Sequence, residues 1–109
     1  MSLTQSIYVP LAVSAGSSGA SSAINCKAYT TGVIEVSGIS GDTVLLQTRL
    51  NPGGGWYTHG VTNASGSTVS ASILTDGLYQ FNIAGIAELR SSWTFSSGDL
   101  NIGIRLSDQ

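Results

Sequence analysis

The chain carries few residues that could do acid–base or nucleophilic chemistry, and only one of them is a histidine. His59 lies in the stretch NPGGGWYTHG at residues 51–60, close to three glycines and Trp56. A serine–histidine–aspartate arrangement would need this histidine as its base. The residues around it in the sequence include no carboxylate. We therefore interpret His59 as an exposed histidine at the end of a turn and predict no catalytic residue.

The sequence predicts no metal or cofactor site either. No histidine or cysteine spacing resembles a zinc site. The aspartates in the turns at 40–42, 75–77 and 97–99 each stand without a second carboxylate, whereas calcium needs several oxygen ligands from one loop. The glycines at 53–55 lack the lysine and the serine or threonine of a phosphate-binding loop. We expect a protein that is not an enzyme and that holds no cofactor.

Aromatic residues beside the glycine run allow two further interpretations. Trp56, Tyr57 and Tyr29 could stack on sugar rings, as in a carbohydrate-binding or adhesion module. Tyrosine and tryptophan are equally typical of protein interfaces. The proline and glycines of residues 51–55 are those of a tight turn. The stretch therefore predicts a hairpin whose second strand begins at Trp56, and we favour contact with another protein.

Charged residues make up 9% of the 109 residues, against about 25% in a typical soluble domain. One lysine and three arginines leave no basic patch for nucleic acid. An uncharged polar surface resists self-association poorly, which favours a protein that works in an assembly. Cys26 is the only cysteine, so no internal disulfide is possible. The sequence predicts no signal peptide and no membrane span.

The elements that must position these residues are predicted to be strands. Apolar and polar residues alternate with period two at 7–14, 32–39, 43–50, 68–74, 78–85, 87–95 and 99–106. Glycine-rich turns separate these segments. The pattern predicts an all-β, antiparallel, jelly-roll-like β-sandwich of seven or eight short strands. The residues expected in its core are Ile34, Val36, Val44, Leu46, Tyr79, Phe81, Leu89, Trp93, Leu100, Ile102 and Ile104.

Three segments are predicted along the chain. SSGASS at 17–22 has the composition of a flexible linker, which would separate an N-terminal arm at 1–16 from a β-sandwich domain at 23–109. Pro10 disfavours a central strand, and the apolar stripe of the arm needs a partner. We expect the arm to serve assembly, so that its deletion leaves the domain stable. The expected assembly contacts are Ile7, Val9, Leu11, Val13, Trp56 and Tyr57.

Two longer stretches carry a resemblance to a known family: VIEVSGISGDTVLLQTRLNPGGGWYTHG at 33–60 and TDGLYQFNIAGIAELRSSWTFSSGDLNIGI at 75–104. Over about residues 30–106 the chain resembles small structural proteins of tailed bacteriophage virions. It departs from their pattern in the Asn-Pro pair at 51–52 and in a longer insert at 60–72. The matching residues are Gly38, Gly41, Asp42, residues 53–56, Asp76, Gly77, Tyr79, Leu89, Arg90, Ser97 and Gly98.

The resemblance implies a virion component, which would be either a capsid cement (decoration) protein or a tail or neck subunit. We favour capsid cement, because the chain is one small domain with an uncharged surface. Such a protein would bind the major capsid protein on the capsid surface as a homotrimer, after synthesis in the host cytoplasm. Neither nucleic acid nor a membrane is expected as a partner. A carbohydrate-binding or adhesion module is the alternative from another class.

Overall fold

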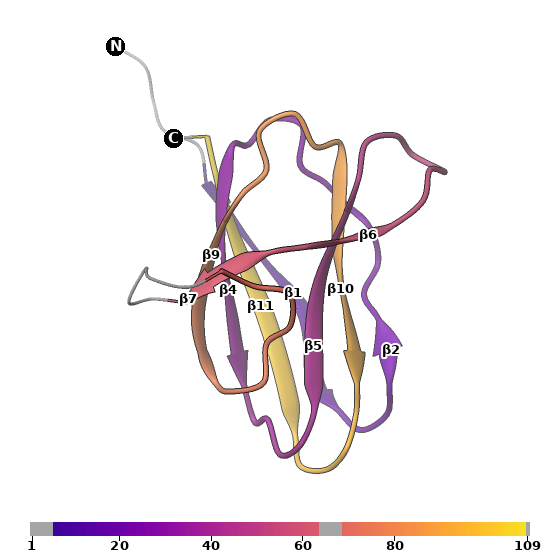
Figure 1. Ribbon diagram of the computed structural model, residues 1–109, viewed down its shortest axis with the longest axis vertical. Helices are drawn as coiled ribbons and strands as arrows, with labels where there is room; N and C mark the ends of the chain where they lie inside the picture. Colours follow the sequence, from indigo (N-terminus) through magenta and orange to yellow (C-terminus); the bar gives the residue numbers. More distant parts are fainter. Residues whose placement is uncertain (1–5, 64–68, 109) are drawn as a thin grey trace.

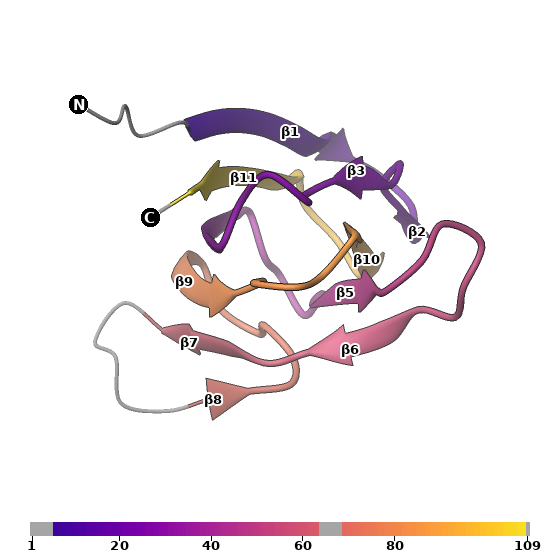
Figure 2. The same cartoon turned by 90° about the horizontal axis from the view of Figure 1, so that it is seen from above.

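The computed structural model describes residues 6–63 and 69–108. Within these residues the protein consists of eleven β-strands and contains no helix (Figure 1). The strands form two antiparallel sheets packed face to face (Figure 2). This arrangement confirms the predicted all-β sandwich. In the described part of the chain, no helix is long and apolar enough to cross a membrane.

The larger sheet has six strands in the order β1-β11-β4-β9-β7-β8. Every neighbouring pair is antiparallel, and β1 and β8 form the two edges. The bounds of its strands are β1 (Ser6–Ala15), β4 (Thr31–Ser37), β7 (Val61–Asn63), β8 (Val69–Ser70), β9 (Gly77–Asn82) and β11 (Leu100–Ser107).

The smaller sheet has five strands, in the order β2-β10-β5-β6 with β3 beside β2 on β10. Its strands are β2 (Gly19–Ala20), β3 (Ile24–Asn25), β5 (Thr43–Arg49), β6 (Tyr57–His59) and β10 (Glu88–Thr94). Gly60 alone separates β6 from β7, so the chain steps from one sheet to the other there and closes that side of the sandwich. The segment predicted as a strand at 68–74 is reduced to β8 and one bridge between Val44 and Ile73.

The period-two pattern forms the core because alternate side chains of each strand point to the same face. Ten of the eleven expected core residues are buried between the sheets. Trp93 is the exception, since its ring is half-buried at the margin of the core. There the indole Nε1 donates a hydrogen bond to the Ser17 carbonyl at 2.8 Å.

The expected separate arm is instead the edge strand β1. It pairs with β11 of its own sheet from Ser6 opposite Ser107 to Ala15 opposite Leu100. The edge position agrees with the expectation from Pro10. The apolar stripe is broken, because the pairing register shifts between residues 10 and 12 and again between 12 and 15. Such irregularities reverse which side chains face the core, so that Ala12 is buried and Val13 is 73% exposed.

The expected linker at 17–22 is also ordered. Its β2 pairs with β10, and its serines form hydrogen bonds to the same strand and to the residue that follows it. The Ser21 amide donates to the Ser91 carbonyl, the Ser21 hydroxyl accepts from the Ser91 amide, and the Ser18 hydroxyl accepts from the Phe95 amide. Short hydroxyl side chains therefore fix the segment to the sheet, although its composition predicts flexibility.

Candidate functional site

The predicted assembly residues do not lie on one surface. Ile7, Val9, Leu11 and Val13 follow β1 at the edge of the larger sheet, whereas Trp56 and Tyr57 lie at the start of β6, at the opposite edge of the smaller sheet (Figure 2). Val9 and Leu11 pack against the core, and Ile7 and Val13 are exposed. β1 therefore keeps two outward apolar side chains and uses the other two for its own fold.

The stretch 51–60 forms the predicted hairpin between β5 and β6. The Gly54 amide donates to the Asn51 carbonyl at 2.9 Å, and Gly53 has a φ of 84°, a conformation that favours glycine. Tyr57 is 73% exposed at the base of this hairpin. Tyr29, by contrast, packs against the core. Of the three aromatic residues considered for sugar binding, only Tyr57 presents an open ring.

Trp56 is the centre of a side-chain cluster on the outer face of the smaller sheet. The guanidinium carbons of Arg49 and Arg90 lie 4.3 and 4.5 Å from the Trp56 ring centroid, within the range of cation–π attraction. Arg49 also forms an ion pair with Glu88, with Nη2 and Oε1 2.6 Å apart, and Arg90 Nε donates to Gln47 Oε1 at 2.8 Å. We call these five residues the paired face, because each charged group already has a partner.

His59 lies in β6 and is half-buried rather than exposed in a turn. It stands opposite Leu46, and its ring meets the Phe81 ring edge-on at a centroid distance of 6.4 Å. The prediction of an exposed turn histidine is therefore wrong. Because Leu46 and Phe81 both point into the core, the imidazole packs at the interior margin of the sandwich.

The remaining reactive or charged buried groups serve the fold. Burial raises the pKa of the Cys26 thiol to about 11, its own backbone hydrogen bond lowers that pKa, and the negative charge of Glu88 raises it. Asp42 is buried, and its Oδ1 accepts from the amides of Ser40 and Ser97, joining two loops at one end of the sandwich. Among the described residues, no group of three or more His, Cys, Asp and Glu side chains is placed to hold a metal ion.

The outer face of the larger sheet is where the structure brings together groups that sequence analysis did not connect. One cross-strand row crosses all six strands, and each member stands directly opposite the next. Two shorter rows flank it. The central row is Tyr8, Arg105, Val33, Gln80, Thr62 and Val69, and the flanking rows are Ser6, Ser107, Thr31, Asn82 and Pro10, Gly103, Glu35, Leu78. We call these three rows the open face.

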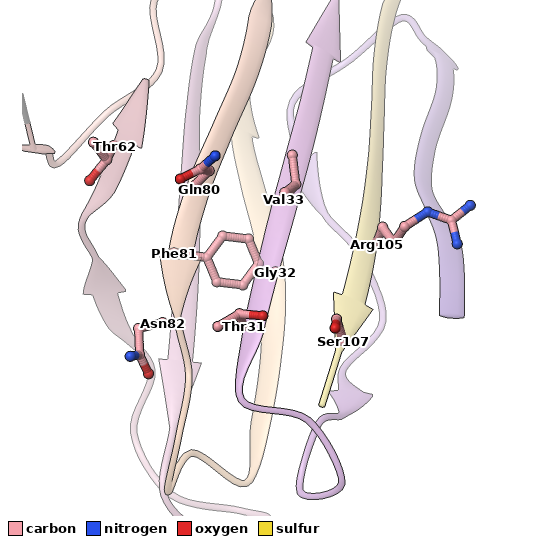
Figure 3. A pocket seen from close by; sticks show the side chains of 9 residues that line it. All are labelled: Thr31, Gly32, Val33, Thr62, Gln80, Phe81, Asn82, Arg105 and Ser107. Atoms are coloured by element: carbon pink, nitrogen blue, oxygen red, sulfur yellow. The ribbon is translucent and has the colours of Figure 1, made fainter. Parts of the chain in front are cut away.

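The open face is hollowed along the central row. A groove of about 570 Å³ lies over β7, β9, β4 and β11, with the buried Gly32 and Phe81 among the residues that line it (Figure 3). A second hollow of about 350 Å³ continues toward β1 and is lined by Tyr8, Leu78 and Gly103. Both hollows are bounded by Val33 and Arg105. Together they form a shallow trough across the strands.

Tyr8 lies close against the sheet in this trough because Gly103 has no side chain. A Cβ atom at Gly103 would collide with the end of the Tyr8 ring, so the ring lies directly over the Gly103 backbone. The Arg105 guanidinium carbon lies 5.7 Å from the ring centroid, and its Nη1 donates to the Ser6 hydroxyl at 3.4 Å. The glycine in the alternating segment NIGI was the one available sequence signal for this site, because a strand glycine often marks a close approach.

Comparisons with known proteins identify two solved structures with a similar fold. No protein-family model matches the chain, and no curated protein matches its sequence. The crystal structure of the SPBc2 prophage-derived protein YomS is similar at a TM-score of 0.87 and 16% identity, over 98% of this chain and 96% of that chain. The crystal structure of the PBSX exported protein XepA is similar at a TM-score of 0.88 and 15% identity, over 98% of this chain. This chain spans about 39% of XepA. The protein therefore shares its fold with two phage-derived proteins.

Proposed function

We propose that this chain is a non-enzymatic structural protein of a tailed bacteriophage, and that it acts as a capsid cement protein on the major capsid subunits. The likeness to two phage-derived proteins over 98% of the chain supports the phage origin. In this proposal the protein works through contact surfaces on the outside of the virion. Self-association as a homotrimer forms part of the proposal.

The observation that carries the proposal is the edge strand β1. It is ten residues long and contains no charged residue, and within the described part of the chain its outer side has no partner strand. Soluble proteins usually protect such an edge with lysines or inward-pointing charges. Here only Pro10 and the register shifts interrupt it. A strand from a neighbouring subunit can add to such an edge by main-chain hydrogen bonds.

The side chains favour contact over catalysis. His59 packs against Phe81, and the Cys26 thiol is buried with a raised pKa. The carboxylates of Glu88 and Asp76 are engaged with Arg49 and with the amides of Gly38 and Ile39, respectively. These groups have structural partners, which supports a protein that binds other subunits.

The test uses a charge placed on the edge. We expect Val13→Lys to abolish co-sedimentation with heads built from the major capsid protein of the same phage. A neighbouring strand added to β1 would bury part of the lysine side chain, and the cost of burying its charge would oppose the addition. Leu74→Lys is the matched control, since Leu74 is 60% exposed and lies outside every strand. Light scattering after size-exclusion chromatography gives the oligomer: a trimer supports cement, whereas a hexameric ring would assign the chain to a tail or neck. Binding of Val13→Lys as tight as that of the parent chain would refute the role of β1.

A further inference from the structure

We propose that the trough of the open face binds a neutral carbohydrate chain, with one sugar ring stacked on Tyr8. The site lies on the face of the larger sheet, whereas the assembly edge of the proposed function lies along the outer side of β1. The two functions can therefore be separated by mutation.

The aromatic platform is the first argument. A sugar ring has an apolar C–H face that packs on a flat aromatic ring, and tyrosine offers such a face with a polar tip. Tyr8 is 50% exposed, and in the absence of ligand its ring already lies against the Gly103 backbone, with the Arg105 guanidinium 5.7 Å from the ring centroid. An unsupported tyrosine would lose more side-chain entropy on binding, and a prearranged ring avoids much of that cost.

The polar groups around the platform are the second argument. Gln80, Thr62 and Glu35 make no side-chain hydrogen bond within the part of the chain that the structure describes, and all three line or border the hollows. Amide, hydroxyl and carboxylate groups donate to and accept from sugar hydroxyls. The trough holds one cation, Arg105, and one anion, Glu35. This balance fits a neutral ligand better than a polyanion or a basic peptide.

The length and the position of the trough are the third argument. From β1 to β7 it crosses four strand spacings, about 19 Å at roughly 4.8 Å each, which suits a linear oligosaccharide rather than a single small molecule. An extended peptide would bind by main-chain hydrogen bonds along the free side of an edge strand, whereas the trough runs across the strands, over main-chain groups that are already paired within the sheet. A rigid protein partner would have to match each unpaired polar group in place, whereas freely rotating hydroxyls can adjust to them.

The experiment follows backbone amide shifts of the ¹⁵N-labelled protein during titration with cellotetraose, maltotetraose and N-acetylchitotetraose. We expect saturable shifts at Val33, Gln80 and Arg105 with at least one of these sugars. Tyr8→Ala removes the platform, and Gly103→Ala displaces the ring while keeping the tyrosine. Each should weaken binding about tenfold or more, equivalent to about 1.4 kcal/mol.

Tyr57→Ala tests the other exposed tyrosine, at the far edge, and a loss of affinity there in place of Tyr8 would overturn the proposal. Leu74→Ala is the control, because it removes an exposed apolar side chain that lines neither hollow. Both variants should leave the affinity within about twofold, as expected for residues outside the site. Thermal unfolding of each variant confirms that it is folded before titration. The proposal is overturned if none of the three sugars gives saturable shifts at concentrations up to roughly 10 mM, which is high enough to detect binding with a dissociation constant of about 1 mM. It is equally overturned if Tyr8→Ala binds like the parent, or if the same amides shift on dilution alone, which would show that a second copy covers the face.

Discussion

The two outer faces of the sandwich carry similar kinds of side chain and use them in opposite ways. On the paired face, Arg49 stands directly opposite Glu88 and Arg90 directly opposite Gln47. Directly opposed side chains on neighbouring strands are the ones that interact most closely. The guanidinium groups then gather around Trp56. The polar side chains of this face therefore bind one another and Trp56.

On the open face the same residue types fall out of register. Arg105 stands opposite Tyr8 and Val33, whereas Glu35 stands opposite Gly103 and Leu78. The one arginine and the one glutamate are therefore not directly opposed, and Glu35, Gln80 and Thr62 have no side-chain hydrogen bond within the described residues. The difference teaches that cross-strand register, rather than composition, decides which face of this protein can bind.

The largest expected effect comes from removing β1, which supplies the first member of each row on the open face. We expect deletion of residues 1–16 to cost several kcal/mol, because Val9, Leu11 and Ala12 lose their packing at roughly 1.5–3 kcal/mol for a fully buried large aliphatic residue. This expectation reverses the one drawn from the sequence. Chemical denaturation measures the loss, and a truncated chain of unchanged stability would restore the idea of a separate arm.

Two glycines that each lie beneath an aromatic ring give the next test. A Cβ at Gly32 would collide with Phe81 and press on Leu106, both of which are buried, so Gly32→Ala should cost about 1–3 kcal/mol of stability by overpacking. A Cβ at Gly103 meets Tyr8, whose ring can swing into solvent. Gly103→Ala should therefore cost less than about 0.5 kcal/mol. Equal losses in urea unfolding would mean that the Tyr8 ring is as firmly held as the core.

The aromatic residue at the centre of each face, Trp56 or Tyr8, should contribute differently to stability. Trp56→Ala removes two cation–π contacts and should lower the free energy of unfolding by about 2 kcal/mol. Tyr8→Ala should lower it by about 0.5 kcal/mol, since this half-exposed ring contacts one guanidinium at 5.7 Å. The melting temperatures of the two variants, measured side by side, check the order. A larger loss for Tyr8→Ala would contradict the distinction between the faces.

A smaller effect is expected from the glutamates. Glu88→Gln weakens the ion pair with Arg49 and should cost about 0.5–1 kcal/mol, a range that allows for solvent screening at a partly exposed site. Glu35→Gln should leave stability nearly unchanged, because this side chain has no ion-pair partner within the described residues. Since salt screens charges, the unfolding free energies of Glu88→Gln and Glu35→Gln should differ less at high ionic strength. A persistent gap would point to packing instead of charge.

The last test concerns pH. Burial, with a contribution from Glu88, holds the pKa of Cys26 near 11 in the folded protein against 9.0 for an ordinary thiol. The unfolded chain therefore loses this proton first, so the stabilising contribution is complete below pH 9 and declines as the pH rises from 9 to 11. Cys26→Ala should flatten this decline in a pH series of melting temperatures. If the melting temperature of Cys26→Ala falls between pH 9 and 11 as steeply as that of the parent, other groups cause the loss of stability.

Much of the fold was predictable because alternation alone determines which side chains face inward. The sandwich and the expected core residues other than Trp93 follow from it, and the hairpin at 51–60 follows from its proline and glycines. The order of β1 and of residues 17–22 was not predictable, because both depend on distant parts of the chain. β1 pairs with β11, and the Ser21 and Ser18 hydroxyls accept hydrogen bonds from the Ser91 and Phe95 amides. The open face was missed for the same reason. Its members come from strands far apart in the sequence, and a register error of one residue would place Gln80 in the core.

The pairing of β1 with β11 also has a mechanical consequence. The strands are antiparallel, and Ser6 stands opposite Ser107, so the described chain begins and ends at the same corner. Tension applied between those ends would open the seven cross-strand pairs one after another, like a zipper. A push along the axis of β1 would instead load all of them together. The domain should thus yield easily when pulled by its ends and resist shear along β1, the direction in which the proposed contact with a neighbouring subunit would load it.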